Sequence, residues 1–270
     1  MTTLLDAHHH FDFLEGWGLR RRLLAALEAE GIRLVAQTLT PSSFLELQAA
    51  AGEELRGARP PLWSAGFHPW RIEGGEQAER ELEALEAALS LTRFVGEIGL
   101  DFVPRRLEAA PAELQLRVLR RVLELACSAG ERRGADEPVV LSIHAVRAGG
   151  EVMRLLAEAR VDERNVVPVL HRFPGGEQEV RRLIELGGCL SVHPSMLEGR
   201  RGRAAVAQMP GDRLLLESDL PREQVAAGAD PGAEELARSL RGALAGIAEL
   251  RGEDVAEQIA HAQSRLYDVR

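Results

Sequence analysis

Lysine is absent from the 270-residue sequence, so all 33 of its basic residues are arginine. This absence excludes several chemistries. A P-loop needs a lysine on the nucleotide phosphates, and a Schiff-base enzyme needs an amine nucleophile. A two-metal centre bridged by a carboxylated lysine is excluded as well. Any ionic grip on phosphate in this protein must therefore come from arginine.

The sequence is also poor in cysteine and in long apolar runs. Cys127 and Cys189 are the only cysteines, and each lies in an apolar stretch, so we expect two buried thiols and no disulfide framework. No apolar run approaches the roughly 18 residues of a membrane span, and no secretory signal precedes Asp6. We therefore expect a soluble, cytoplasmic protein without a membrane partner. The formal charge of -9 argues against a surface coated for nonspecific DNA binding.

Short apolar, β-branched runs alternate with longer stretches of helical periodicity, which predicts βαβ units and a parallel sheet. Eight strands are expected, at Thr3–His10, Ile32–Thr40, Leu62–His68, Phe94–Leu100, Val139–His144, Val166–His171, Cys189–His193 and Arg213–Asp219. Helices are expected between them, for instance at Gln77–Leu89 and Glu177–Leu186, with closing helices at Glu234–Leu250 and Glu253–Leu266. The polar residues at or near the strand ends recur every 22 to 30 residues, except for one step of 47 that holds an extra loop with Pro104 and Pro111. This rhythm predicts one α/β domain over residues 1–270, a TIM-like (β/α)8 barrel.

Seven of the eight histidines fall at predicted strand ends, and only His261 lies in a helical stretch. The strand-end set is His8, His9, His10, His68, His144, His171 and His193, joined by Glu97 on strand four and Asp219 at the end of strand eight. Any one of these histidines could be an ordinary core or surface residue. As a group they indicate a site, because the C-terminal ends of barrel strands converge on the active site.

Strand alternation places His8 and His10 on one face and His9 on the other, so the first two can bind one ion. Imidazole and carboxylate donors suit Zn, Mn, Co or Fe, and Mg less well. The supply of donors is sufficient for two ions, which need a bridging carboxylate. With no lysine available, Glu97 is the expected bridge.

Six segments in this order resemble the TatD family of metal-dependent deoxyribonucleases. They are Asp6-Ala7-His8-His9-His10-Phe11-Asp12, Gly66-Phe67-His68-Pro69, Gly96-Glu97-Ile98-Gly99-Leu100-Asp101-Phe102, Ile143-His144-Ala145-Val146-Arg147, His171-Arg172-Phe173-Pro174-Gly175 and Leu216-Glu217-Ser218-Asp219. The resemblance spans residues 6–219 and implies an amidohydrolase-like TIM barrel with two divalent ions, either Zn, Mg or Mn.

The resemblance also implies roles for individual residues. One ion would be held by His8, His10, Glu97 and Asp219, and the other by Glu97, His144 and His171. Glu97 and Asp219 would be the catalytic pair, with Asp219 the general base on a water activated by both metals. Asp12 and Asp101 would be hydrogen-bond partners of the ligands.

Substrate contacts are expected from His68, Arg147 and His193. His68 either contacts a phosphate or is a structural histidine ahead of Pro69. Arg147 matches the family's His-x-x-Arg spacing. His193 is either a contact at the rim or a packed residue. Arg147 is one of several arginines that follow strand ends, the others being Arg71, Arg105, Arg106, Arg172, Arg200, Arg201, Arg203 and Arg222.

The sequence departs from the family in two places. His171 is followed by Arg172-Phe173-Pro174-Gly175 where Cys and Ser are usual, and the family's Arg-Gly-Lys and Asn-Glu-Pro tail is missing. Segment 191–196 resembles the TatD-like subunits of multi-gene antiphage systems. Three hypotheses follow. The first is an exonuclease that acts as a monomer on single-stranded or frayed DNA. The second is another ester or amide hydrolase, such as a D-aminoacyl-tRNA deacylase. The third is a metal-bound subunit of a larger complex, with little activity alone.

Overall fold

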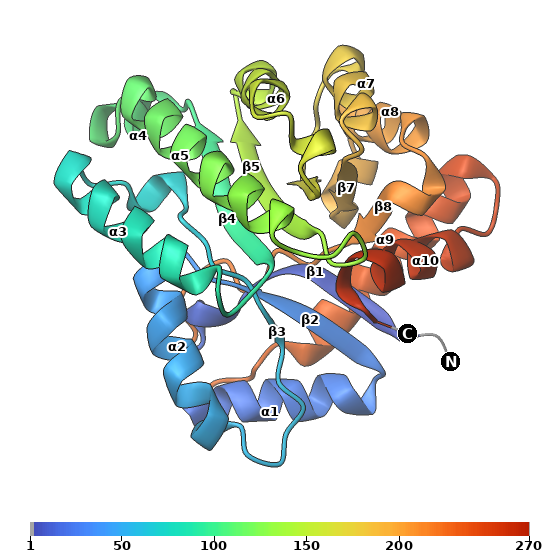
Figure 1. Cartoon of the computed structure of the whole chain (residues 1–270). Helices are drawn as coiled ribbons and strands as arrows, with labels where there is room; N and C mark the ends of the chain where they lie inside the picture. The colour runs from blue at the N-terminus through green and yellow to red at the C-terminus, as the bar shows by residue number, and fades with distance from the viewer. Residues whose placement is uncertain (1–2, 270) are drawn as a thin grey trace.

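A computed structural model describes residues 3–269 and shows a parallel barrel surrounded by helices (Figure 1). The eight strands are β1 (Leu4–His10), β2 (Ile32–Gln37), β3 (Leu62–Trp63), β4 (Phe94–Asp101), β5 (Val139–Val146), β6 (Val166–His171), β7 (Cys189–Val192) and β8 (Leu214–Leu216). Their order in the sheet is β3-β2-β1-β8-β7-β6-β5-β4, and the pairings are parallel. The predicted α/β barrel is confirmed.

The barrel is closed between its first and last strands in the sheet order, β3 and β4. Two isolated bridges, Ser64 with Phe94 and Phe67 with Ile98, join the segment around β3 to β4. Regular pairing of β3 itself covers only two residues. The chain after β3 therefore follows β4 through single bridges rather than through a continuous ladder.

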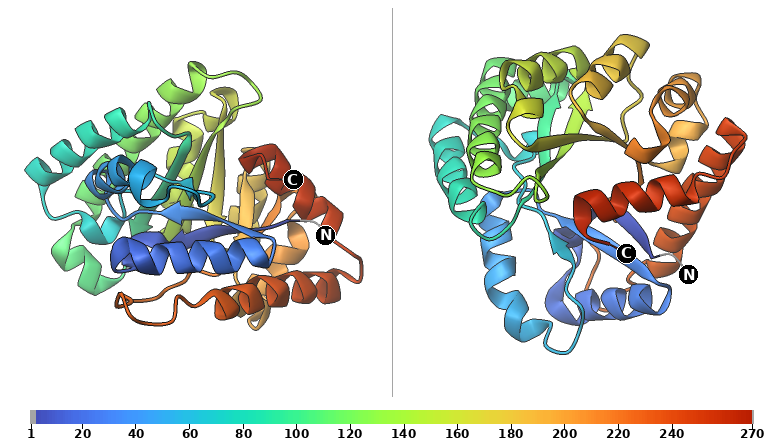
Figure 2. Two further views of the ribbon diagram at one scale, coloured as in Figure 1. Left: turned by 90° about the horizontal axis from the view of Figure 1, so that it is seen from below. Right: turned by 45° about the vertical axis from the view of Figure 1, so that its right-hand side comes forward.

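Ten α-helices are found among residues 3–269, and most of them pack around the barrel (Figure 2). They are α1 (Gly16–Ala29), α2 (Pro41–Glu54), α3 (Gly75–Ala88), α4 (Pro104–Ala109), α5 (Ala112–Glu131), α6 (Gly149–Glu158), α7 (Glu177–Glu185), α8 (Arg200–Gln208), α9 (Ala233–Arg251) and α10 (Ala256–Tyr267). The four helices expected from periodicity correspond to α3, α7, α9 and α10. The prediction of an extra loop around Pro104 was wrong, because Pro104 begins the short helix α4.

Helix α5 shows why these segments are helical. Its buried residues Val118, Leu119, Val122, Leu123 and Ala126 recur at spacings of three and four, which places them on one face towards the barrel. Exposed arginines and glutamates cover the opposite face. Burial of this apolar stripe stabilises the helix more than its intrinsic propensity does.

The lower half of the barrel interior is filled with apolar side chains. This cluster takes one or two residues from each of seven strands, together with residues of the last turns of α10 and one residue that follows it. Its members are Leu5, Ala7, Val35, Phe94, Val140, Val169, Cys189, Leu215, Ala262, Leu266, Tyr267 and Val269. Helix α10 thus covers the end of the barrel where the strands begin (Figure 2). Cys127 and Cys189 are buried free thiols, as expected.

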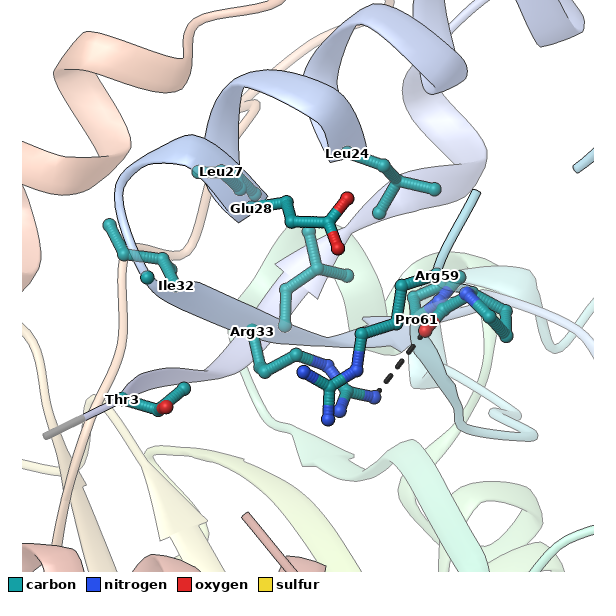
Figure 3. Close-up of a pocket in the computed structure, with 11 residues that line it drawn as sticks. Thr3, Leu24, Leu27, Glu28, Ile32, Arg33, Arg59 and Pro61 are labelled. Atoms are coloured by element: carbon teal, nitrogen blue, oxygen red, sulfur yellow. Dashed lines mark hydrogen bonds between the residues drawn. The ribbon is translucent and has the colours of Figure 1, made fainter. Parts of the chain in front are cut away.

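A small cavity of about 60 Å³ lies near the start of β2, at the same end of the barrel (Figure 3). Leucines of α1 line it together with Glu28, Arg33 and Arg59, and Arg33 donates to the carbonyl of Pro60. Its charged side chains belong to the surface around β2. The strand-end histidines lie at the opposite end of the barrel.

Several strands end earlier than the sequence predicts. Strand β2 ends at Gln37 rather than Thr40, and β8 ends at Leu216 rather than Asp219. In both places side chains add to the backbone hydrogen bonds: Thr38 donates its hydroxyl to the carbonyl of Ser64, and Asp6 accepts from the amide of Ser218. In residues 3–269, no helix is long and apolar enough to cross a membrane.

Candidate metal centre and active site

Two strands are irregular next to residues predicted as metal ligands. The pairing of β1 with β2 shifts between Asp6 and His9, and the pairing of β4 with β5 shifts between Val95 and Ile98. A bulge of this kind re-aims a side chain relative to strict alternation. The shifts lie next to His8 and Glu97, the two most deeply buried of the predicted ligands.

Glu97 stands at the centre of the histidine cluster, with 2% of its side chain exposed. Its Oε1 lies 2.8 Å from Nδ1 of His144, 2.8 Å from Nε2 of His171 and 3.1 Å from Nε2 of His68. Its Oε2 faces the other side, 3.4 Å from Nε2 of His8 and 3.6 Å from Nε2 of His10. The two oxygens of one carboxylate therefore face two groups of imidazoles, as a bridging ligand requires.

Asp219 completes the group of His8 and His10, which faces Oε2 of Glu97. Its Oδ1 lies 3.3 Å from Nε2 of His10 and 4.0 Å from Nε2 of His8. Atoms bound to one tetrahedral zinc at about 2.0 Å are separated by about 3.3 Å, so these spacings leave room for an ion between the ligands. Donor atoms form three candidate metal groups among residues 3–269: His8 with His10 and Asp219, His68 with Glu97 and His144, and His8 with His171 and Glu217.

His8 has a buried ring nitrogen that is suited to bind a metal ion. Its ring is fully buried, and burial lowers its pKa to about 3, which keeps the imidazole neutral. Nδ1 lies 2.8 Å from the hydroxyl of Ser142, whereas Nε2 has no hydrogen-bond partner among residues 3–269. A neutral ring held at Nδ1, with Nε2 facing two carboxylates, is the usual arrangement of a metal-ligating histidine. The residues present therefore fit a divalent ion.

Glu97 and His171 shift each other's pKa. Burial alone would raise the pKa of Glu97, but the imidazoles of His68, His171 and His8 lower it well below its usual value. Burial would lower the pKa of His171, yet Glu97 and Glu217 raise it well above 6.5. Glu97 is thus ionised, and a protonated His171 faces it. A bound divalent ion would replace that proton.

Glu217 contacts the histidine cluster through His171, and the sequence analysis assigned it no role. It is fully buried, its Oε1 lies 3.7 Å from Nδ1 of His171, and neither of its oxygens has a hydrogen-bond partner among residues 3–269. Burial raises its pKa. Strand alternation gives no signal for Glu217, because β8 ends one residue before it, at Leu216.

Asp101 lies where a partner of the ligands was expected. Its Oδ2 accepts from Nε1 of Trp70 at 2.7 Å and lies 3.4 Å from Nε2 of His144. Burial would raise the pKa of Asp101, but the hydrogen bonds with His144 and Trp70 lower it to about 2. Asp12 does not reach the ligands by a hydrogen bond in the same way, because its Oδ2 accepts from the amide of Leu39.

The cluster forms the floor of a cavity of about 610 Å³ at the C-terminal ends of the strands. Its apolar wall includes Phe13, Leu39, Trp70, Val146 and Pro174. Three arginines line it as well, Arg147, Arg172 and Arg222. Within residues 3–269, neither Arg147 nor Arg222 has a carboxylate oxygen within 4.0 Å, so their charges are available to an anion.

Of the three expected substrate contacts, His68 and Arg147 line the cavity, whereas His193 is packed beside a short helix. His68 lines the cavity, accepts from the amide of Trp70 through Nδ1 and directs Nε2 at Glu97. Arg147 lines it at the end of β5. His193 is 93% buried and accepts through Nδ1 from the amide of Ser195, so it caps the short 3-10 helix η4 (Pro194–Leu197). That placement agrees with the packed alternative, and a substrate contact by His193 stays a prediction.

His9 and Trp70 complete the comparison with the sequence. His9 is buried, and among residues 3–269 its ring forms no ion pair within 4.0 Å, in line with its expected exclusion from the ligands. Trp70 was not singled out, although it follows His68 by two residues and half of it is exposed in the cavity. A tryptophan in a loop gives no sequence signal that distinguishes a cavity wall from the core.

Comparison with known proteins gives a consistent result. The chain matches the family described as TatD related DNase over residues 5–268. It is 29% identical over 224 residues to the uncharacterized metal-dependent hydrolase YjjV of Escherichia coli K12, with 80% of this chain and 79% of that protein covered. It is 30% identical over 207 residues to the 3'-5' ssDNA/RNA exonuclease TatD of Cronobacter sakazakii, with 75% and 72% covered. The crystal structure of YjjV, a TatD homolog, superimposes with a TM-score of 0.75 and 25% identity over 99% of this chain and 98% of that chain.

Proposed function

Because the chain belongs to the family of TatD-related DNases, metal-dependent hydrolases, we propose that it hydrolyses phosphodiester bonds at the ends of DNA strands. The observation that carries the proposal is the position of Glu97 between two groups of imidazoles, with Asp219 beside one of them. The name of the Cronobacter relative, an exonuclease of single-stranded DNA and RNA, supports this substrate class.

The residues that would hold the ions follow from the cluster. His8, His10, Glu97 and Asp219 would hold one divalent ion, and Glu97, His144 and His171 would hold the other. Two such ions lower the pKa of water to about 7 and stabilise charge on the phosphoryl oxygens. The mixed nitrogen and oxygen donors suit Zn or Mn better than Mg.

The chain's own residues supply the remaining steps. Asp219 would accept the proton of the attacking water. Burial alone would raise its pKa, but His10, His171 and His8 lower it below its usual value, so the carboxylate is ionised and free of a proton of its own. Arg147, Arg172 and Arg222 bind phosphate oxygens at the cavity wall, where guanidinium groups can donate two parallel hydrogen bonds. The apolar wall limits the water that reaches the scissile bond.

The test uses the purified full chain with Mg, Mn or Zn and an end-labelled single-stranded oligonucleotide. We expect stepwise shortening of the DNA. Asp219→Asn should slow it by at least about a hundredfold, since a positioned general base contributes about 10²–10⁴-fold. Asp136→Asn, in the exposed turn before β5, is the matched control and should cleave at the wild-type rate. No shortening with any of the metals, or equal rates for Asp219→Asn and wild type, would disprove the proposal.

A further inference from the structure

Trp70 is a large aromatic side chain exposed at the active-site cavity. It lies in the 3-10 helix η2 (Pro69–Arg71), directly after His68, and 50% of it is exposed. Within residues 3–269 only Leu91 and Val146 are comparably exposed large apolar residues, and Val146 lines the same cavity. Trp70 and Val146 thus bring exposed apolar surface to the wall of the cavity that holds the histidine cluster.

The indole is fixed in place from two sides. Its Nε1–H donates to Oδ2 of Asp101 over 2.7 Å, and its backbone amide donates to Nδ1 of His68 over 3.0 Å. The His68 ring stands edge-on to the indole, with the ring centroids 5.1 Å apart. Because His68 also faces Glu97 and Asp101 also faces His144, the indole has a set position relative to the metal ligands.

Arg106 covers a face of this indole. Its Cζ lies 3.9 Å from the ring centroid, within the range of a cation-π contact. Among residues 3–269, no carboxylate oxygen lies within 4.0 Å of the Arg106 guanidinium. Arg106 belongs to α4, a six-residue helix with no buried residue, so few contacts hold it in position. The indole face is therefore occupied by a flat group that another flat group can replace.

We propose that Trp70 is the stacking platform for an unpaired nucleobase next to the scissile phosphodiester, and that the base displaces Arg106 from the ring. The proposal rests on the proposed function. The Trp70 and His144 ring centroids are 6.4 Å apart, which is close enough for a base on the indole and a phosphate at the ligands to belong to one dinucleotide. Aromatic side chains bind bases of single strands in this way, because every base has a π face.

The platform predicts a substrate preference. A paired base is already stacked within its duplex and cannot lie flat on Trp70. The protein should therefore act on single-stranded or frayed ends, whereas a site that gripped only phosphates would accept both forms. The preference would come from the aromatic wall of the cavity, and the metal ligands would have no part in it.

Calorimetric titration without metal tests the platform apart from cleavage. The ligands are a thymidine hexanucleotide and a hexamer of abasic deoxyribose phosphates with the same number of phosphates, each in EDTA. Trp70→Leu should weaken binding of the thymidine hexamer by about ten- to a hundredfold, the usual loss per stacked base, and leave the abasic hexamer unchanged. Trp70→Phe, which keeps a ring but loses the bond to Asp101, should stay within about threefold of wild type.

Two controls make the result specific. Leu91→Ala, at an equally exposed apolar site before β4, should bind both hexamers as wild type does. Arg106→Ala should raise the ratio of thymidine to abasic affinity, because the base no longer competes with the guanidinium. Circular dichroism and the melting temperature verify that each variant is folded.

The contrary outcomes are distinct. Equal losses of Trp70→Leu on both hexamers, an unchanged affinity, or Trp70→Phe as weak as Trp70→Leu would each overturn the platform. A lower affinity ratio in Arg106→Ala would overturn the displacement of Arg106. If wild type cleaves DNA while Trp70→Leu keeps the wild-type ratio, the platform fails and the proposed function stands. If wild type neither binds the hexamers nor cleaves DNA, both fail.

Discussion

Arg172 donates from Nη1 to Oδ2 of Asp219 over 2.6 Å, while the other oxygen of Asp219 faces His10 at 3.3 Å. One carboxylate is thus shared between the histidine cluster and a cation on the cavity wall. The Arg172 side chain is 40% exposed and lines the cavity, so it can contact a phosphate and the proposed general base together. Arg172 also occupies one of the positions where this sequence departs from its family.

Replacing Arg172 by alanine should separate substrate binding from metal binding. We expect kcat/KM on DNA to fall about ten- to a hundredfold, because hydrogen bonds between charged groups contribute about 1.5–3 kcal/mol. Metal affinity should not fall, since the lost group is a cation beside a metal ligand. Steady-state kinetics and calorimetric titration of the metal measure the two effects. Arg181→Ala, on the outer surface of α7, serves as the control. Weaker metal binding by Arg172→Ala would contradict this division of roles.

Metal binding should release protons at neutral pH. Glu97 and Glu217 raise the pKa of His171 against the effect of burial, and Asp101 and Glu97 do the same for His144. A ligating histidine must be neutral, so apparent metal affinity should rise with pH through these raised pKa values and fall as the pH drops. Titration in buffers of different ionisation enthalpy counts the protons, and we expect about one to two per chain at pH 7.

The raised histidine pKa values also affect the stability of the metal-free protein, which falls as the pH rises. A histidine with a raised pKa stabilises the fold fully below its unfolded value of 6.5, and this stabilisation is lost as the pH rises through the folded value.

Glu217→Gln removes one of the two carboxylates that raise the pKa of His171, so fewer protons should be released on metal binding. An unchanged proton count in Glu217→Gln would show that Glu217 does not control His171.

The gathering of strand-end histidines around Glu97 could be predicted from sequence, because the C-terminal ends of parallel barrel strands meet at one end of the barrel. Strand ends recur at regular spacing, and a histidine such as His144 or His171 at such an end has little choice of direction. Trp70 and Glu217 could not be found in this way. Their roles depend on contacts with Asp101 and His171, which are distant in sequence, and on burial that no local pattern reports.

Strand lengths were predicted less well for a related reason. The apolar pattern continues past Gln37, so β2 was expected to reach Thr40, yet the Thr38 hydroxyl bonds outside the ladder. The shift in pairing beside Glu97 is equally invisible in the sequence. Pattern analysis assumes regular strands, whereas the irregular positions are the ones that direct side chains into the site.

Asp101 should set the orientation of His144. Asp101→Asn keeps the shape of the side chain but weakens its contact with His144 Nε2 at 3.4 Å. Loss of such a partner of a metal-ligating histidine usually costs about 10–100-fold in metal affinity or activity. Metal titration should show this loss, and Asp136→Asn should not. Wild-type metal affinity in Asp101→Asn would mean that Glu97 alone orients the ring.

Gly66 determines whether the barrel can close beside the site. A Cβ at this position would lie 1.8 Å from the carbonyl oxygen of Thr38 and 2.5 Å from the amide nitrogen of Glu97, and neither backbone atom can move freely. Gly66→Ala should therefore destabilise the protein by about 3 kcal/mol or more, which lowers the melting temperature by about 6–12 °C.

The matched control for Gly66→Ala is Gly52→Ala in α2, where a Cβ would meet no atom within 4 Å. That change should stabilise by about 0.5–1 kcal/mol, as expected for glycine to alanine in a helix. Because β3 pairs over only two residues, a shift of the chain at Gly66 is transmitted to Glu97 rather than absorbed by a ladder. Gly66→Ala should thus lose metal affinity along with stability. A stable Gly66→Ala variant with wild-type metal binding would show that the segment after β3 can move without disturbing Glu97.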